Sequence, residues 1–171
     1  PFTDAEILRT NLASVVLQMK TLRLGDLLRF PLLDVPEAKA VNDALTLLAE
    51  LGAVRRAEDD ALTAVGRQMA RLPVDPRLAR MLLAAVEGGG AAEVLVIVAA
   101  LSVQDPRERP ADKRAQADQS HAEWRDPASD FASFLNLWRW YEAQREAMSR
   151  NALRKLCVQR FLSPLGMQEW R

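Results

Sequence analysis

The sequence predicts a mainly α protein in which a winged helix with a small β-hairpin precedes a helical bundle. Of the 171 residues, 49% are apolar, which is enough to fill one substantial core or two small ones. Several segments repeat apolar residues at spacings of three and four, as amphipathic helices do. One stretch, residues 53 to 63, has short extended segments around a polar tip and indicates a hairpin.

Two long helices are expected in the first part of the chain. The first begins at a capping box formed by Thr3 and Glu6, and its apolar face continues to Leu22. A helical turn over residues 26 to 30 then leads to a second apolar stripe over residues 38 to 51. This second stripe predicts a helix that Gly52 closes.

The predicted hairpin follows directly and completes a winged helix. Residues 53 to 56 and 61 to 63 are its expected strands, and the acidic residues 58 to 60 form its tip. We therefore assign residues 1 to 72 to a winged-helix domain and residues 73 to 171 to a helical-bundle domain.

The bundle is expected to begin at a proline-rich break. Asp75 should cap its first helix, with Pro76 in the first turn. Residues 91 to 103 are apolar on nearly every side, so we expect this helix at the centre of the bundle, with protein around it. Residues 129 to 141 and 152 to 161 predict two further amphipathic helices.

Charge and composition narrow the class of protein. The 23 basic and 23 acidic residues balance, so nucleic-acid binding would need a local patch. One cysteine and one histidine allow neither an internal disulfide nor a structural zinc site, and they fit a reducing compartment. The longest apolar run, residues 94 to 101, is less than half the ~20 residues that cross a bilayer. With no visible signal peptide, the expected location is cytoplasmic.

Candidate binding residues gather in the polar stretch from residue 104 to residue 126, where we predict a loop with one solvated helix. Four cations lie within eight residues, namely Arg107, Arg109, Lys113 and Arg114. Guanidinium forks suit phosphate oxygens, but neighbouring acids partly cancel the field. From the residues alone, a solvated loop with local ion pairs is favoured over RNA contact.

Three polar residues extend this candidate set. Ser102 and Gln104 lie at the end of the preceding helix, where they could hydrogen-bond a backbone or a base edge. Asn136 is a polar residue within an apolar helix. Each could instead satisfy a buried backbone group, and for Asn136 this structural role is slightly favoured.

Other chemistry is not supported by the residue pattern. The glycine cluster at residues 88 to 90 lacks the Lys and Ser/Thr of a phosphate loop, so we expect no nucleotide site. His121 lies in a polar stretch and is expected to be solvated. Four aromatic side chains could stack on bases, namely Trp124, Trp138, Trp140 and Tyr141. Trp138 and Tyr141 fall on the apolar stripe of their helix, so core packing is favoured.

Several strings resemble the segment that follows the motor in DEAH-box ATP-dependent RNA helicases. They are AEILRTNL at 5 to 12, LGDLLRFPLLDVP at 24 to 36, LTAVGRQMARLPVDPRLARMLL at 62 to 83, ALSVQDPRERP at 100 to 110 and SDFASFLNLW at 129 to 138. The string at 7 to 19 looks most like the bacterial HrpA subgroup. The family often has Pro where Ala64 stands here, a difference confined to a loop.

The resemblance implies a part of a longer chain, which the start at Pro1 without an initiator methionine also predicts. Two RecA-like motor domains that use ATP and Mg²⁺ should precede it, and an oligonucleotide-binding-type domain should follow. This segment would be the winged helix and the helicase-associated, ratchet-like domain, inactive as an ATPase on its own. It would border the channel for single-stranded RNA through Ser102, Gln104, Asn136 and the four cations.

One alternative from another class remains open, a stand-alone winged-helix regulator of nucleic acid or a protein-interaction adaptor. A recognition helix over residues 38 to 51 would carry Asp43 and Glu50, with Glu37 just before it, against Lys39 alone. Phosphates would repel that balance, so protein docking is the better expectation for this helix.

Overall fold

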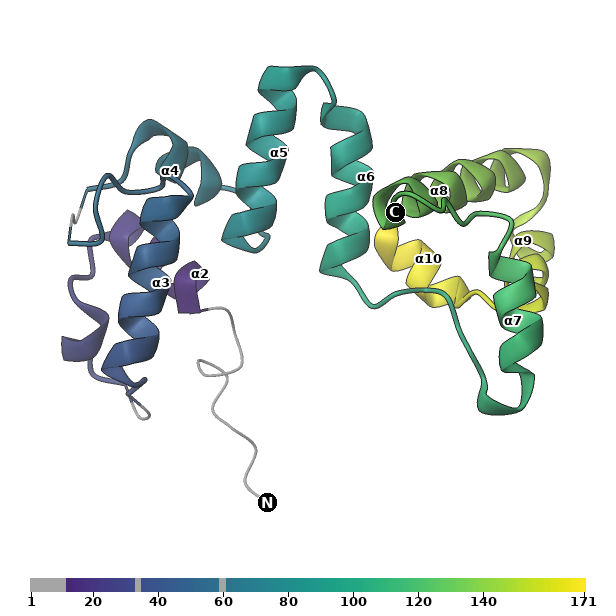
Figure 1. The fold of residues 1–171 in the computed structure, drawn as a ribbon, viewed down its shortest axis with the longest axis horizontal. Helices are drawn as coiled ribbons and strands as arrows, with labels where there is room; N and C mark the ends of the chain where they lie inside the picture. Colours follow the sequence, from purple (N-terminus) through teal and green to yellow (C-terminus); the bar gives the residue numbers. More distant parts are fainter. Residues whose placement is uncertain (1–11, 33–34, 59–60) are drawn as a thin grey trace. The chain divides into compact units, whose positions relative to one another are not determined.

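The computed structural model describes residues 12–32, 35–58 and 61–171, drawn in Figure 1. The chain divides into two compact units, residues 1–89 and 90–171, and each has its own apolar core. Throughout the described residues the regular structure is helical, so the predicted mainly α class is correct. The predicted Thr3 and Glu6 capping box lies outside the described residues.

The first unit contains five helical elements in its described part. They are α2 (Leu12–Leu22), η1 (Leu27–Arg29), α3 (Ala38–Glu50), α4 (Ala64–Met69) and α5 (Pro76–Gly88). Helix α2 packs against α3, and α4 packs against α5. The core lies between them and includes Leu17, Leu48 and Met69. Burial of one face of each helix matches the apolar spacing of the sequence.

The predicted β-hairpin is wrong, because the described residues between α3 and α4 form turns and bends and not strands. The backbone N–H groups of Ala53 and Val54 donate to Leu48 O at 2.8 and 3.4 Å, so they finish helix α3 and are not free for a ladder. Among the described residues, one backbone bond, Thr63 N to Ala53 O at 2.9 Å, joins the two arms. A β ladder needs a series of such pairs. Asp59 and Asp60, at the expected tip, lie outside the described residues.

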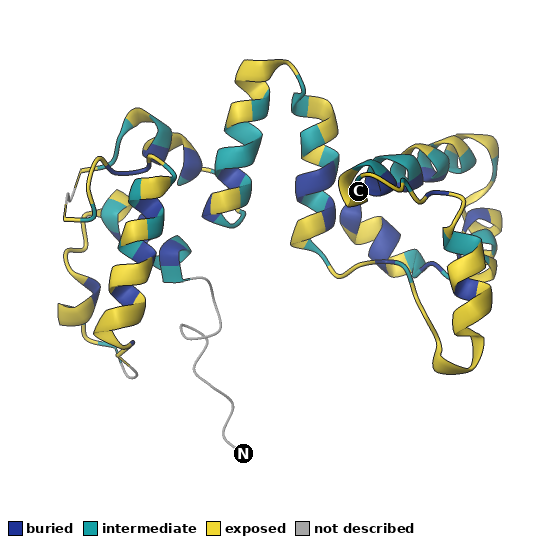
Figure 2. Ribbon diagram, in the orientation of Figure 1, coloured by how far each residue is buried: buried dark blue, intermediate teal, exposed yellow. Residues whose placement is uncertain are grey.

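The second unit begins with a long helix and ends with a short one. Its elements are α6 (Ala91–Ser102), η2 (Ala111–Lys113), α7 (Arg114–His121), α8 (Asp130–Ala147), α9 (Arg150–Gln159) and α10 (Pro164–Trp170). Helix α7 is the solvated helix predicted within the polar stretch, and Figure 2 shows that most of its surface is exposed. Ala117 is its buried residue. Helix α10 was not predicted, because seven residues are too few to reveal a helical period.

Helix α6 is less enclosed than its composition predicts. It packs against α8 and α10, and the indole N–H of Trp170 donates to Val96 O at 2.8 Å. Leu95 and Leu101, however, are 55% and 43% exposed. The expectation of protein on every side is therefore wrong within the described residues. An apolar composition predicts burial, but it does not determine how many neighbours a helix has.

Gly66 allows the close approach of α4 to the end of α3. A Cβ at this position would collide with the carbonyl group of Ala53, which is backbone and cannot rotate away. The N–H of Gly66 is also held, since it donates to Thr63 Oγ1 at 2.9 Å as the cap of α4. Only glycine fits this contact without a shift of the backbone.

We expect Gly66→Ala to destabilise the first unit by about 1–3 kcal/mol, the usual cost of overpacking. Gly88→Ala is the matched control, because a Cβ there meets nothing within 4 Å. All four tryptophans lie in the second unit. Urea unfolding followed by circular dichroism should therefore show an earlier transition for Gly66→Ala, while the transition in tryptophan fluorescence stays in place. If both glycine variants unfold at the same urea concentration, the close contact between Gly66 and Ala53 does not limit the stability of the first unit.

Candidate nucleic-acid interface

Two loops far apart in sequence are joined in the second unit by a pair of backbone hydrogen bonds. Glu108 N donates to Phe161 O, and Ser163 N donates to Pro106 O, both at 2.8 Å. Between these bonds Leu162 is fully buried. We call this antiparallel contact the loop clasp. It fixes the backbone of the polar stretch against the end of α9.

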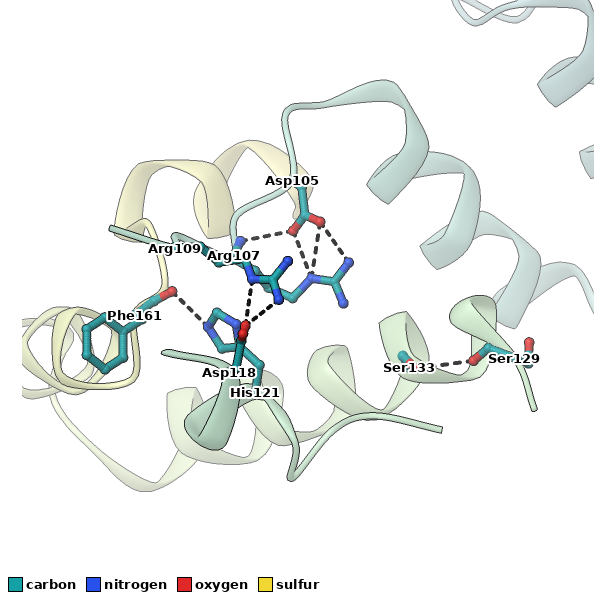
Figure 3. Close-up of polar contacts among 8 residues, drawn as sticks. All are labelled: Asp105, Arg107, Arg109, Asp118, His121, Ser129, Ser133 and Phe161. Atoms are coloured by element: carbon teal, nitrogen blue, oxygen red, sulfur yellow. Dashed lines mark hydrogen bonds and ion pairs between the residues drawn. The ribbon is translucent and has the colours of Figure 1, made fainter. Parts of the chain in front are cut away.

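The carbonyl group of Phe161 has a second partner in the same place. His121 Nε2 lies 3.0 Å from Phe161 O. Figure 3 draws this contact as a dashed line. Because a carbonyl oxygen only accepts, Nε2 carries the proton in this contact. Phe161 itself has a φ of 55°, a left-handed conformation that a bulky residue rarely adopts. The prediction of a solvated His121 is wrong, because the fold brings the end of α9 onto α7 and half-buries the ring.

The loop clasp places Arg107 beside Asp105 in a multiply hydrogen-bonded ion pair. Arg107 Nε donates to Asp105 Oδ1 at 3.0 Å, and Nη2 donates to Oδ2 at 2.7 Å. The backbone N–H of Arg107 also donates to Oδ1 at 2.9 Å (Figure 3). The guanidinium group lies over the ring of Phe134, 4.9 Å from its centroid. Arg107 is therefore held from two sides, with a third of its side chain still exposed.

These contacts affect the charge state of Asp105. Partial burial opposes ionisation, but hydrogen bonds from the side chain and backbone of Arg107 outweigh that cost and are helped by its positive charge. The pKa of Asp105 therefore lies below its usual value of 3.8. The ion pair stays charged throughout the neutral range.

A second ion pair lies next to the first. Arg109 Nε donates to Asp118 Oδ1 at 2.6 Å, and its Nη2 contacts the same oxygen. Both pairs line an open pocket of about 380 Å³. Its lining is Asp105, Arg107, Arg109, Asp118, His121, Ala122, Arg125, Asp130 and Ser133. Three arginines face three aspartates there, so the pocket has little net charge but many oriented N–H donors.

The other predicted site residues are separate from this pocket. Lys113 and Arg114 are exposed at the start of α7, and within the described part of the chain neither has an ion pair. Gln104 is exposed as well. Of the seven predicted residues, the structure thus brings only Arg107 and Arg109 into one pocket.

Ser102 and Asn136 have the structural roles that were the alternative to RNA contact. Ser102 Oγ donates to Val98 O at 2.8 Å, one turn earlier in its own helix. Asn136 Nδ2 donates to Trp124 O at 3.3 Å. Each hydrogen bond satisfies a backbone carbonyl that the fold brings within reach. Any contribution of these two residues to RNA binding stays a prediction.

The aromatic residues of the second unit pack in its core or against it, as the sequence predicted for Trp138 and Tyr141. Trp124 and Tyr141 are each 4% exposed, and Trp138 and Trp140 pack against the same core. The rings of Trp124 and Trp140 lie 4.8 Å apart, and Arg160 lies over both. The buried rings of Trp124 and Tyr141 are therefore not available to stack on bases.

Seven of the nine residues that line the pocket were not binding candidates in the sequence, and two of them carry N–H donors on a ring or guanidinium group. Arg125 and His121 both line it, although neither was a binding candidate. Arg125 follows α7 in a turn, and only the folding of α7 onto the loop clasp brings it near Arg107. No spacing in the sequence could have revealed this arrangement.

Comparison with protein families identifies the class to which the chain belongs. A family described as helicase-associated domain (HA2), winged-helix, matches residues 44–74, and the helicase-associated domain (HA2), ratchet-like, matches residues 75–156. The two matches adjoin and together cover about two thirds of the chain. This chain belongs to the helicase-associated HA2 family, as the resemblance implied.

Among its relatives are bacterial proteins of the HrpA type. It is 50% identical over 99% of its length to the ATP-dependent RNA helicase HrpA homolog of Haemophilus influenzae, and 49% identical over 99% to ATP-dependent RNA helicase HrpA of Escherichia coli. It is 34% identical over 98% of its length to the pre-mRNA-splicing factor ATP-dependent RNA helicase prp22 of Schizosaccharomyces pombe. The chain spans 13% or 14% of the length of these relatives.

The family boundary and the packing boundary differ in the structure. The family matches meet between residues 74 and 75, whereas the compact units meet between Gly89 and Gly90. Helix α5 accounts for the difference, because Ala79 and Leu83 pack with the core of the first unit. The domain limits predicted from the sequence, with the boundary after residue 72, stay a prediction.

The loop clasp should contribute strongly to the stability of the second unit. We expect Leu162→Ala to lower its free energy of unfolding by about 2–5 kcal/mol, because a fully buried leucine is lost. Leu165→Ala is the control, since that side chain is 65% exposed and its loss should change the free energy by less than about 0.5 kcal/mol. Urea unfolding followed by tryptophan fluorescence measures both. Similar effects of the two variants would mean that the loop clasp carries little stability.

Asp105 should make the second unit sensitive to acid. Its pKa in the folded state is depressed, so its stabilisation is complete above the usual value of 3.8 and is lost as the pH falls through the lower, folded value. We expect the difference in unfolding free energy between the unchanged protein and Asp105→Asn to shrink as the pH falls below 3.8. Asp112→Asn, an exposed change in the same loop, is the control. A difference that stays constant from neutral pH to pH 3 would exclude the ion pair as its source.

Proposed function

We propose that this chain is the accessory segment of a cytoplasmic ATP-dependent RNA helicase and forms part of the wall of its channel for single-stranded RNA. Similarity at 49% and 50% identity over nearly the whole chain, to proteins named as ATP-dependent RNA helicases, carries the proposal. The RecA-like motor domains with ATP and Mg²⁺ would precede it, and an oligonucleotide-binding-type domain would follow. The segment alone would not hydrolyse ATP.

The local geometry supports Arg107 as a phosphate ligand. A guanidinium group has five N–H donors, and Asp105 occupies only one edge of the fork. Fixing a free arginine would cost about 2 kcal/mol of rotamer entropy. Asp105, Phe134 and the loop clasp have already reduced that freedom here. The remaining donors can meet a phosphate oxygen with little further ordering.

Charge balance supports backbone contact of low sequence specificity. With three arginines and three aspartates, the pocket would not attract nucleic acid strongly by itself. Weak, oriented contacts suit a wall along which a strand must move. As the motor domains open and close with ATP, this wall would hold the strand between steps. Binding strength would then come mostly from the motor.

The exposed acids of α3 favour the accessory role over a free-standing DNA-binding regulator. Glu37, Asp43 and Glu50 are all exposed in the structure. A helix with this surface would be repelled by the phosphates of duplex DNA. We propose that α3 docks against protein in the longer chain.

We expect replacement of Arg107 and Arg109 with Ala, in the full-length helicase, to lower RNA-stimulated ATP hydrolysis and unwinding. If both residues contact phosphates, the salt dependence of single-strand binding should fall by about 1.4 in log–log slope, since each contact contributes about 0.7. Arg139→Ala removes an exposed cation from α8 and is the matched control. Unchanged ATPase activity and unchanged slope in the double variant would remove these arginines from the channel.

A further inference from the structure

A second pocket in the second unit is strongly basic, in contrast to the balanced pocket above. It lies among α8, α9 and α10 and has a volume of about 430 Å³. Its lining is Tyr141, Arg145, Met148, Arg150, Leu153, Arg154, Cys157, Pro164, Gln168 and Arg171. Four of these residues are arginines and none is acidic. We call this site the arginine pocket.

Helix α9 forms one side of the arginine pocket. Arg150, Leu153, Arg154 and Cys157 share one face of this helix at helical spacing. Leu153 and Cys157 are buried and form the floor, while Arg150 and Arg154 are exposed at the rim. Like charges four residues apart destabilise a helix slightly. Within the described residues, no ion pair of Arg150 or Arg154 offsets this repulsion.

The opposite side of the pocket is only partly neutralised. Arg145 donates to both carboxylate oxygens of Glu142, at 3.0 and 2.9 Å, and Arg171 Nε lies 3.5 Å from Glu142 Oε1. One carboxylate thus serves two arginines. Glu146 also acts on Arg145 through its charge. Even when both glutamates are counted against the four arginines, two positive charges remain in excess.

The floor adds no compensating negative charge. Burial raises the pKa of the Tyr141 hydroxyl and of the Cys157 thiol above their usual values, so both groups stay neutral at neutral pH. The positive end of the α9 dipole also lies at the Arg150 rim, since this residue begins the helix. The excess charge is therefore local, although the whole chain has a formal charge of zero.

We propose that the arginine pocket binds a phosphate group. Guanidinium forks match phosphate oxygens in pairs, and a dianionic phosphate would balance the two excess charges, whereas a single carboxylate would leave one. The apolar floor can cover an attached group, and the volume is in the range of small-ligand sites. The phosphate could belong to an RNA strand or to a small phosphorylated molecule.

This proposal goes beyond the proposed function and does not depend on it. The arginine pocket shares no lining residue with the pocket that contains the Arg107–Asp105 and Arg109–Asp118 ion pairs. Loss of phosphate binding at one would leave the other unchanged. The variants that test the two sites are accordingly different.

The test compares the 171-residue chain with its Arg150→Ala/Arg154→Ala variant, which removes two exposed side chains at the rim. Arg139→Ala/Lys155→Ala is the matched control, because it removes two exposed cations of the same unit outside the pocket. Calorimetric titration with inorganic pyrophosphate should show affinity about tenfold lower, or weaker still, for the pocket variant, from two lost charge-assisted hydrogen bonds. The control should stay within about twofold. Saturating pyrophosphate should also raise the urea concentration at which the second unit unfolds, as followed by tryptophan fluorescence. The pocket variant should not show this increase.

A second arm identifies the source of the phosphate. Single-stranded RNA oligomers with and without a 5′-phosphate are titrated with the same proteins. Weaker binding of both oligomers by the pocket variant supports a phosphate of the RNA backbone, and a loss limited to the phosphorylated oligomer supports a terminal phosphate. A loss limited to pyrophosphate supports a small phosphorylated ligand.

Two results would overturn the proposal. The first is equal affinity of the unchanged protein, the pocket variant and the control variant for pyrophosphate and for both RNA oligomers. The second is a loss that appears only with a glutamate-rich peptide, which would make the pocket a protein-docking site. Fluorescence unfolding of the pocket variant checks that the second unit remains folded in either case.

Discussion

The second unit depends on the loop clasp, a contact of two backbone hydrogen bonds across more than fifty residues of sequence. Burial of Leu162 beneath these bonds protects them from water, and the carbonyl of Phe161 also accepts from His121. The contact orients the backbone of Arg107, and with it the ion pair to Asp105. Without the loop clasp, the charged and proline-containing stretch from residue 104 to residue 126 would bury too little apolar surface to offset the entropy lost on ordering.

In the second unit, the charge of each pocket is set by its own side chains and cannot be read from the net charge of the chain. Arg107 and Arg109 are each held by an aspartate, so their pocket presents oriented donors with almost no net field. Arg150 and Arg154 have no such partner within the described residues. One surface thus suits weak contact with a moving strand, and the other suits retention of an anion. Both pockets lie in a chain with no formal net charge.

Much of the helical structure was predictable from local features. Asp75 caps α5 with Pro76 in its first turn, and Ser129 caps α8, as polar and proline signals imply. The hairpin prediction was wrong because the N–H groups of Ala53 and Val54 donate to the end of helix α3. The composition of these residues does not show which acceptor their N–H groups will use. Family membership was also readable from the sequence, because the matching strings extend along nearly the whole chain.

The sequence by itself determined the mainly α class, the positions of most helices and the family, because helical period, caps and strings of residues are local properties. Tertiary structure decided which cations are paired across separate segments, whereas Arg107 pairs with Asp105 only two residues away. Arg109 meets Asp118 and the Arg107 pocket gains Arg125 only after α7 folds back on the loop clasp. Likewise the arginine pocket forms only where α8, α9 and α10 converge. Electrostatic interactions depend on distances in space, and residues close in space here are distant in sequence.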